Sequence, residues 1–471
     1  MSLTSSQADS TGRLSWTVMT AKGLGIIAGV AAVPRVLWLL VASRAPVGLF
    51  DPQIYLSAAQ SIAAGHGYRS LTGTVTTYYP PGYPFFLGAI YRVCDLVGLT
   101  GRFFTVVAVV QGTLGVFATL GVAVIAARIA GARVGMAAGL VVALWPNLIL
   151  HTTLLLSETL FIAISVGAVL AVMMAFDSSG RKSSVWLVSS GLVCGLAVLT
   201  RPQAGFLLVP VIFVATLASG MDWRRTIAVT GLMAAGVVVV VAPWTLRNAS
   251  VMGSAVIVST NVGDNICIGF NPDANGGFAM APACQAETAY TDGPTQEVSR
   301  DNELKSKSIR WVRNNIGRLP GLSISKLRIT FEGDHDALRA AESFDQDKFL
   351  AHWQRTMLRW VSDLYYWVMA VLGVSGLFVL ARLIRPKSEH HETRQGDPAP
   401  VARSFSMERF LGLYVVLTIA VGALVPILSF GDQRFKVPVE PFIAILSALM
   451  LSRIASLFLR SESPHEMVIG A

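Results

Sequence analysis

Long apolar stretches separated by polar segments recur along most of the sequence. Each is close to the about 20 residues that an α-helix needs to cross the hydrocarbon core of a bilayer, and there are about ten of them. They are Thr17–Val41, Phe103–Ala127, Val134–Leu150, Glu158–Phe176, Val185–Thr200, Gln203–Leu217, Thr226–Leu246, Trp360–Leu383, Phe410–Ser429 and Val437–Leu457. The pattern predicts an all-α polytopic membrane protein, a bundle of about ten transmembrane helices.

Composition agrees with this class. Charged residues make up 14% and hydrophobic residues 53% of the 471 residues, whereas a soluble domain is about a quarter charged. The net charge of +9 does not indicate a nucleic-acid partner, because the basic residues are spread between the apolar stretches, where they set orientation in the membrane. The first stretch is too long for the apolar part of a signal peptide, so we expect a retained helix.

The polar segment after the first span predicts two helices at the membrane surface. Asp51-Pro52 fits the N-cap and first position of a short amphipathic helix, Gln53–Ala64, and Gly65-His66-Gly67 would end it. Tyr83–Gly98 is apolar but short for a span and carries charged residues, so it predicts an interfacial helix.

If Tyr83–Gly98 lies at the membrane surface and does not span, lysine and arginine fall mainly in every second connection between the spans. The richer set contains Arg13, Lys22, Arg128, Arg133, Arg181, Lys182, Arg224, Arg225, Arg385, Lys387, Arg394, Arg403 and Arg460. Short cytoplasmic connections are enriched in these residues, so we expect the richer set and both termini in the cytoplasm.

This topology divides the chain into five parts. We expect a disordered cytoplasmic N-terminus (1–16), a transmembrane module (17–246) with an outer loop (44–102), an extracytoplasmic loop element (247–359), C-terminal transmembrane helices (360–457) with a cytoplasmic linker (384–407), and a cytoplasmic tail (458–471). The loop element opens with turn signals at 261–265 and 271–277, and helical patterns follow over Thr295–Asn315 and after Pro320.

Charged residues at the ends of the apolar stretches gather on the expected outer side. They are Asp51, Glu158, Arg201, Arg247, Arg434 and Lys436. A carboxylate can take a proton from a hydroxyl or amine acceptor, and arginine or lysine at headgroup depth can hold a phosphodiester. The set fits transfer of a group from a lipid phosphate to an acceptor, with the cations stabilising the leaving phosphate.

Each residue also has a simpler structural explanation. A carboxylate just after a span can be solvated or cap a helix, the helix dipole alone favours Glu158, and the cations can reach toward headgroups. Tyr78, Tyr79 and Tyr83 fit an aromatic belt, and His151 fits an ordinary loop residue. These explanations do not predict that the charged residues share one side of the membrane.

Seven short motifs follow one another in order. They are Asp51…Tyr55…Gly65-His66-Gly67-Tyr68, Pro80-Pro81-Gly82-Tyr83-Pro84, Leu156-Ser157-Glu158-Thr159-Leu160-Phe161, Gly195-Leu196-Ala197-Val198-Leu199-Thr200-Arg201-Pro202, Pro243-Trp244-Thr245-Leu246-Arg247-Asn248, Gly269-Phe270-Asn271-Pro272 and Arg434-Phe435…Pro438…Pro441. In order and spacing they resemble the GT-C type glycosyltransferases, and more narrowly the bacterial branch related to protein O-mannosyltransferases and lipid A aminoarabinose transferases.

The resemblance implies a helical bundle with juxtamembrane helices in the first outer loop. It also implies a polyprenyl-phosphate-sugar donor and a lipid, polysaccharide or protein acceptor at the outer face of a bacterial inner membrane. Asp51 matches the family's base, Glu158 its second acid and Arg201 its basic residue. The remaining candidates are Arg247, Arg434 and Lys436 for the donor phosphate and Tyr55, Tyr79 and Tyr83 for the wall of the site.

One place in the first outer loop departs from the aminoarabinose transferases. Tyr78-Tyr79-Pro80 stands where those enzymes carry an acid, a lysine and a proline, and Ile54 stands where they carry an arginine. Phosphate contacts that they make from these positions are therefore missing here or come from other residues.

We accordingly expect an inverting hexosyl- or pentosyltransferase in which Asp51 deprotonates the acceptor. Glu158 would orient Asp51, the acceptor or a divalent cation, and we assign no other cofactor or metal ligand. The alternative function is a transporter or flippase for a lipid-linked sugar. A transporter should place ionisable residues near the bilayer midplane, whereas these charges sit at one interface; an assembly subunit is a third interpretation.

The four cysteines divide by topology. Cys94 and Cys194 fall in apolar segments, and Cys267 and Cys284 fall in the long outer loop. A pair on an oxidising side can form a disulfide that persists, while two buried free thiols are the other option. A bridge would hold the Asn/Gly-rich segment between the two cysteines over the site, as part of the acceptor surface.

Overall fold

A computed structural model describes residues 19–285, 293–385 and 405–461. Within these ranges every secondary-structure element is an α-helix or a 3-10 helix. Predictions for the N-terminus before residue 19, most of the linker and the end of the tail lie outside the described residues.

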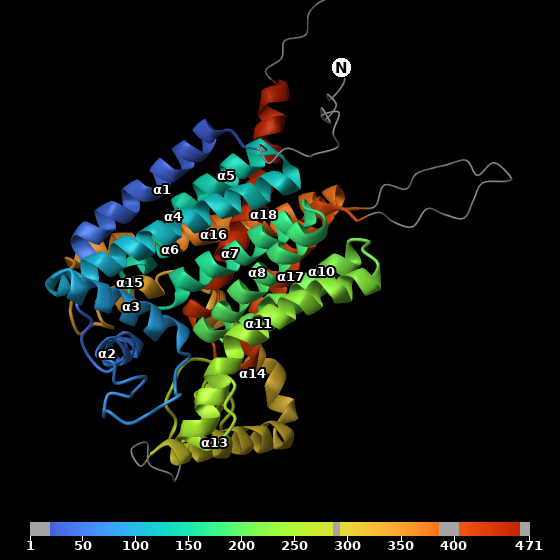
Figure 1. The fold of residues 1–471 in the computed structure, drawn as a ribbon. Coiled ribbons are helices and arrows are strands. Elements are labelled where there is room, and N and C mark those ends of the chain that lie inside the picture. Colours follow the sequence, from blue (N-terminus) through green and yellow to red (C-terminus); the bar gives the residue numbers. More distant parts are fainter. Residues whose placement is uncertain (1–18, 286–292, 386–404, 462–471) are drawn as a thin grey trace, which may run out of the picture.

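Eight of the described helices are long and apolar enough to cross a membrane. These are α1 (Ala21–Ala42), α4 (Phe103–Ala130), α7 (Glu158–Phe176), α8 (Gly180–Thr200), α11 (Trp223–Met252), α16 (His352–Leu383), α17 (Met407–Leu428) and α18 (Glu440–Ser461). Figure 1 shows them packed side by side in one bundle. The protein is a multi-span membrane protein, as the apolar pattern predicts.

Two of the predicted spans are not straight helices. Val134–Leu150 corresponds to α5 (Ala132–Ala143) and α6 (Pro146–Leu150), which are followed by the short helix η2 (His151–Thr153) and meet at a bend of 59°. Pro146 explains the break, because the residue before a proline is driven out of the helical conformation and Trp145 is extended. Gln203–Leu217 is likewise divided, into α9 (Ala204–Leu207) and α10 (Val209–Ala218).

Glycines allow a close crossing in the bundle, between α8 and α11. A Cβ placed on Gly191 would lie 2.2 Å from the carbonyl oxygen of Met233. Small residues are favoured at such contacts because lipid supplies no hydrophobic force and van der Waals packing must hold the helices together.

The non-spanning helices gather at one end of this bundle. They are α2 (Asp51–Ala63) and α3 (Gly82–Leu96) from the first loop, and α12 (Val262–Gly269), α13 (Pro294–Asn314), α14 (Leu319–Phe331) and α15 (Asp336–Ala341) from the long loop. Figure 1 shows α2, α13 and α14 together at the end opposite the C-terminal turns of α18. The loop helices α13 and α14 lie where the sequence predicts them, whereas α12 replaces a predicted turn.

The long loop holds its shape through specific links. Cys267 and Cys284 form a disulfide with Cα atoms 5.7 Å apart, packed against Leu304 of α13. The Arg300 guanidinium donates to both carboxylate oxygens of Asp264 at 2.7 Å, which ties α12 to α13. The loop element therefore has a defined structure although its apolar core is small.

Candidate active site

Four of the predicted charged residues meet at the end of the bundle that carries α2 and α3. Asp51 is the first residue of α2, and Glu158 is the first residue of α7. Arg201 directly follows α8, and Arg434 lies in η5 (Gln433–Phe435), just before α18. Segments far apart in the sequence thus deliver two carboxylates and two guanidiniums to one place.

Asp51 does not have the capping role that the sequence suggests. The N-cap of α2 is Phe50, and no side-chain hydrogen bond caps the helix. Instead Oδ1 of Asp51 accepts a hydrogen bond from the Tyr79 hydroxyl at 2.6 Å, and Oδ2 accepts one from Nη1 of Arg434 at 2.9 Å. The Asp51 carboxylate therefore bonds to Arg434 and Tyr79 at the site instead of to the amides at the start of α2.

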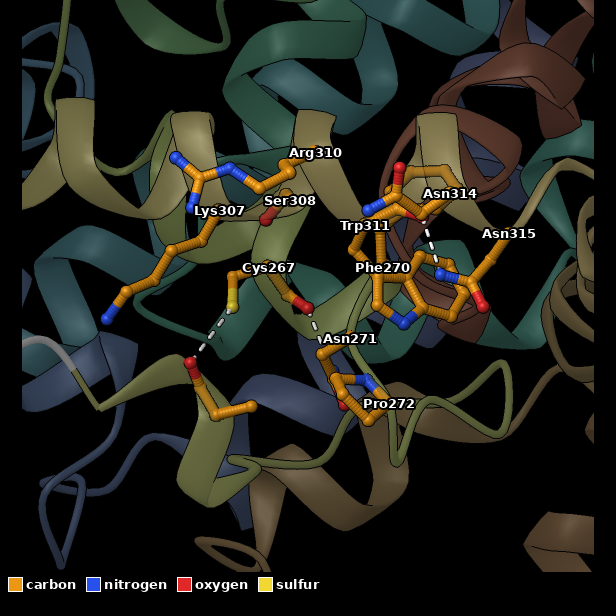
Figure 2. A pocket seen from close by; sticks show the side chains of 11 residues that line it. Cys267, Phe270, Asn271, Pro272, Lys307, Ser308, Arg310, Trp311, Asn314 and Asn315 are labelled. Carbon is orange, nitrogen blue, oxygen red and sulfur yellow. Dashed lines mark hydrogen bonds between the residues drawn. The ribbon is translucent and has the colours of Figure 1, made fainter.

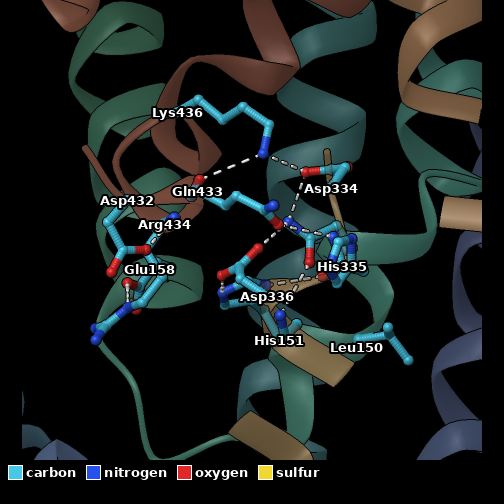
Figure 3. Close-up of polar contacts among 12 residues, drawn as sticks. Leu150, His151, Glu158, Asp334, His335, Asp336, Asp432, Gln433, Arg434 and Lys436 are labelled. Carbon is cyan, nitrogen blue, oxygen red and sulfur yellow. Dashed lines mark hydrogen bonds and ion pairs between the residues drawn. The ribbon is translucent and has the colours of Figure 1, made fainter. Parts of the chain in front are cut away.

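Arg434 lies between the two acids and binds both. While Nη1 reaches Asp51, its Nε donates to Oε1 of Glu158 at 2.9 Å, as Figure 3 shows for Glu158. Nη1 of Arg201 approaches the same Oε1 at 2.7 Å. The Glu158 side chain has no exposed surface, and its Oε2 has no hydrogen-bond partner among the described residues.

The charges of these four side chains balance, and the carboxyl of Asp432, whose pKa burial raises, lies next to them. The carboxylates of Asp51 and Glu158 carry two negative charges, and the guanidiniums of Arg201 and Arg434 carry two positive ones. Burying a charge without a partner is costly, and here each acid has an arginine within hydrogen-bond distance. The balance matters for any further ion that would enter the site.

Tyrosines form the wall beside Asp51. The Tyr55 ring packs edge-on against the rings of Tyr79 and Tyr83, with centroids 5.2 and 5.3 Å away. The Tyr83 hydroxyl donates to Oε1 of Gln111 at 3.0 Å. Burial, and next to it the Asp51 charge, hold the pKa of Tyr79 well above its usual value, so the hydroxyl remains a proton donor to that carboxylate at neutral pH.

Two predicted phosphate-binding residues lie elsewhere. Arg247 donates to the backbone oxygens of Thr76 and Tyr68 at 3.0 and 3.3 Å, and its guanidinium covers the Trp244 ring at 4.7 Å. It therefore fastens the first outer loop to α11. Lys436 is fully buried and pairs with Oδ1 of Asp334 at 2.8 Å. Their hydrogen bonds support structural roles for both side chains rather than the predicted contact with a phosphate.

Sequence reasoning missed a second polar cluster, which surrounds Lys436. Asp334 accepts hydrogen bonds at 2.8 Å from Nε1 of Trp145 and from Nδ2 of Asn147. His151, predicted as an ordinary loop residue, is buried with Nε2 3.6 Å from Oδ2 of Asp336. Figure 3 shows this cluster next to Arg434 and Glu158. The run Asp334-His335-Asp336 was its only signal in the sequence.

The second cluster also holds the segment that carries Arg434. Oε1 of Gln433 accepts from the backbone N–H of His335 at 3.2 Å. Asp432 caps η5 by accepting from the Arg434 N–H at 2.9 Å. Burial raises the pKa of the Asp432 carboxyl. Arg434 is thus placed by a rigid turn rather than by a free loop.

A hollow of about 310 Å³ lies beside the disulfide of the long loop. Its wall includes Phe270, Asn271, Lys307, Arg310, Trp311 and Asn314. Figure 2 shows that α13 supplies Lys307, Arg310, Trp311 and Asn314 on one side, with Phe270, Asn271 and Pro272 opposite. The hollow combines aromatic rings, amides and cations.

The loop beside this hollow is anchored near Arg434. The Gly431 N–H donates to the Gly276 oxygen at 2.6 Å. A Cβ on Gly269 would lie 1.6 Å from the Ser429 oxygen, so only glycine allows α12 to end there. Lys326 seals the contact: its Nζ lies 3.4 Å from the Phe270 ring centroid and donates to the Ile427 oxygen at 3.2 Å.

A family model gives the first comparison with known proteins. The model described as dolichyl-phosphate-mannose-protein mannosyltransferase matches residues 79–246, about a third of the chain. The matched segment contains Tyr79, Glu158 and Arg201, whereas Asp51 and Arg434 lie outside it. No curated protein matches the sequence.

Solved structures extend the comparison to the whole fold. The Archaeoglobus fulgidus oligosaccharyltransferase complexed with zinc and sulfate has a TM-score of 0.52 at 16% identity, covering 93% of this chain and 50% of its own. The same enzyme with an inhibitory peptide and a dolichol-phosphate scores 0.53 at 16% identity, covering 93% and 51%. ArnT from Cupriavidus metallidurans bound to undecaprenyl phosphate scores 0.41 at 15% identity, covering 93% and 79%.

The family-model match and the oligosaccharyltransferase fold together confirm the resemblance to GT-C type glycosyltransferases. The chain has the GT-C fold. It spans about half the length of the oligosaccharyltransferase.

Proposed function

We propose that the protein is a glycosyltransferase that moves a hexosyl or pentosyl group from a polyprenyl-phosphate donor to an acceptor at the extracytoplasmic face. The cluster of Asp51, Glu158, Arg201 and Arg434 at one end of the bundle carries this proposal. A family model named for a dolichyl-phosphate-mannose donor supports it. So does the dolichol-phosphate held by an oligosaccharyltransferase of the same fold.

Asp51 is the residue that we propose as the base. An acceptor hydroxyl attacks the anomeric carbon from the face opposite the phosphate, and its proton passes to the Asp51 carboxylate. The bond between the anomeric carbon and the phosphate oxygen breaks, and its electron pair leaves with the lipid phosphate. A single displacement of this kind inverts the anomeric carbon, and the proton on Asp51 is later released to water.

Arg201 and Arg434 are proposed to bind the donor phosphate. The phosphate gains negative charge as it leaves, and charge-assisted hydrogen bonds from guanidinium groups strengthen with that charge. Glu158 holds both guanidiniums in place through Oε1. Its role in this proposal is to position the arginines, because its side chain is fully buried.

The hollow beside the disulfide is proposed as the acceptor surface. A sugar ring can pack on Trp311, the amides of Asn271 and Asn314 can bind hydroxyl groups, and Lys307 and Arg310 suit anionic groups. The anchor between Gly276 and Gly431 connects this surface to the turn that carries Arg434. These groups favour an acceptor that contains carbohydrate, whether polysaccharide or glycolipid.

The rival function is transport of a lipid-linked sugar. A transporter holds ionisable residues near the midplane of its helices. Arg35 lies within α1, but it is buried and donates to the backbone oxygens of Ala31 and Ala143 at 2.8 and 3.1 Å, which supports a role in helix packing. The clustering of charge at one end favours an enzyme.

A transfer assay tests the proposal. Purified protein in vesicles would be given a panel of polyprenyl-phosphate hexoses and pentoses together with envelope glycan fractions. We expect one donor of the panel to yield polyprenyl phosphate and a glycosylated product. A bacterial strain that lacks the protein should accumulate that same donor. Movement of intact donor across the vesicle membrane without release of phosphate would support the transporter instead.

A further inference from the structure

We propose that Arg434 takes the place of a divalent cation in this active site, so that the transfer runs without a bound metal ion. Its guanidinium would join the two carboxylates and at the same time bind the donor phosphate. The inference rests on the proposed function, and it replaces our expectation from the sequence that a divalent cation lies near Asp51 and Glu158.

The position between the two acids is the first argument. A cation shared by Asp51 and Glu158 would have to lie where the guanidinium of Arg434 now lies. That guanidinium is 2.9 Å from Oδ2 of Asp51 through Nη1 and 2.9 Å from Oε1 of Glu158 through Nε. The two acids therefore already share a cation, and that cation is part of the protein chain.

Charge balance is the second argument. Arg201 adds a second guanidinium 2.7 Å from Oε1 of Glu158, so the two acids and two arginines sum to zero. The side chains of Arg201 and Arg434 are only 10% and 18% exposed. A divalent ion added to this buried cluster would meet two like charges at short range and little water to screen them.

The neighbouring acids do not supply ligands either. In the described ranges no group of three or more His, Cys, Asp or Glu side chains is arranged to hold a metal ion. The nearby Asp334 is bonded to Lys436, Trp145 and Asn147. Arg434 and Lys436, two positions apart, thus provide one cation for each of the two acidic clusters.

Arg434 keeps donors for the substrate. A guanidinium has five N–H groups, and Nε and Nη1 make the bonds to the acids. The hydrogen bonds that Arg434 donates to described residues use its backbone N–H, Nε and Nη1, which leaves Nη2 for a phosphate oxygen. This is the contact that a divalent ion would otherwise make with the leaving phosphate.

Chelation of the wild-type enzyme is the first test. Transfer would be measured in purified protein after treatment with EDTA, and again after addition of Mn²⁺. We expect the rate to change less than about twofold, because no catalytic step uses a bound metal. A loss of tenfold or more that Mn²⁺ restores would overturn the inference while leaving the proposed function intact.

The second test creates the site that Arg434 fills. Arg434→Ala removes the guanidinium that Asp51 and Glu158 share and leaves Arg201 bound to Glu158, so the two acids keep one uncompensated negative charge. We therefore expect the variant to bind Mn²⁺ and to show a rise in the unfolding midpoint of about 3 °C or more at millimolar Mn²⁺. We also expect added guanidinium ion to restore part of its lost transfer activity, which a merely structural arginine would not predict. The wild-type protein should show neither response.

Arg201→Ala is the matched control in the same cluster. It removes a guanidinium that contacts Glu158 but not Asp51, so it should lose activity without gaining a Mn²⁺-dependent midpoint. Equal midpoint shifts in Arg201→Ala, Arg434→Ala and wild type, or none in Arg434→Ala, would overturn the inference. The midpoint needs no donor, so it remains informative even if no donor is transferred and the proposed function fails. If Arg434→Ala does not fold, Arg434→Gln, which keeps part of the side-chain length and removes the charge, takes its place.

Discussion

Exposure separates the two acids of the cluster. The Asp51 side chain is 30% exposed, whereas that of Glu158 is fully buried. Each oxygen of Asp51 has one donor, from Tyr79 or Arg434, and each carboxylate oxygen can accept a second hydrogen bond. An acceptor hydroxyl can therefore reach Asp51 without breaking the cluster, which it cannot do at Glu158.

The first prediction follows from this difference. Asp51→Asn keeps the size of the side chain and removes the base, so turnover should fall by about 10²–10⁴ with the donor affinity and the unfolding midpoint nearly unchanged. Steady-state kinetics with the purified protein, and donor binding measured separately, would check it. Asp95→Asn is the control, because Asp95 is more than half exposed and pairs with Arg92 of the same helix, α3. Wild-type turnover in Asp51→Asn would remove the base assignment.

At the residue scale the sequence predicted that four of these residues would meet, while their chemical roles stay predictions. Asp51, Glu158, Arg201 and Arg434 each stand at the end of an apolar stretch, and the topology brings such ends together. Lys436 stands at an end too, but its partner Asp334 lies 102 positions earlier. A buried ion pair between distant segments leaves no pattern in the sequence, so the prediction gave Lys436 to the phosphate.

Secondary-structure elements show the same division: the sequence predicts those set by local pattern and misses those set by contacts between distant segments. Apolar length predicts the spans, and a proline explains the bend before α6. The helix α12 was missed because Asn261–Asn265 has the composition of a turn. Tertiary contacts decide its structure instead: Arg300 binds Asp264, and Oδ1 of Asp301 accepts from the Gly263 N–H at 2.6 Å.

A prediction about the loop element concerns its disulfide. The bridge joins residues separated by 17 positions, which corresponds to about 3 kcal/mol in the chain-entropy model. The double variant Cys267→Ser, Cys284→Ser should unfold at lower temperature and require more acceptor for half-maximal rate, with donor affinity unchanged. Thermal unfolding and acceptor titration measure both. Reductant should reproduce the effect in the wild type and have no further effect on the double variant. If the wild type and the double variant need the same acceptor concentration for half-maximal rate, the hollow is not the acceptor surface.

Lys326 of α14 carries a prediction about pH. Burial lowers its pKa to about 7 from the usual lysine value of 10.5. Between these values the unfolded chain binds a proton that the folded protein does not, so this lysine makes stability rise as pH increases from about 7 toward 10. Lys326→Met, which retains a long apolar stem, should lose that part of the rise. Unfolding midpoints at pH 7, 8 and 9 would show it, and parallel profiles for the two proteins would contradict the lowered pKa.

At the scale of the whole molecule, charge is placed at the two ends of an apolar bundle. One end of the bundle, where α2, α13 and α14 lie (Figure 1), holds the two clusters of buried acidic and basic side chains. The opposite end carries Arg181, Lys182, Arg224 and Arg225 at the starts of α8 and α11. Arginine and lysine near span ends favour the cytoplasm, so we propose that the active site lies on the other side.

The last prediction tests that orientation with single cysteines and a membrane-impermeant thiol reagent in intact cells. Asp273, exposed in the loop beside the hollow, should label when changed to cysteine, whereas Arg225→Cys should label only after the cells are opened. The wild-type background is suitable because Cys94 and Cys194 are buried and the other two cysteines are bonded. Protection at 273 together with labelling at 225 would reverse the predicted orientation of the bundle in the membrane. The cluster would then face the cytoplasm, and a donor presented at the outer face could not reach it.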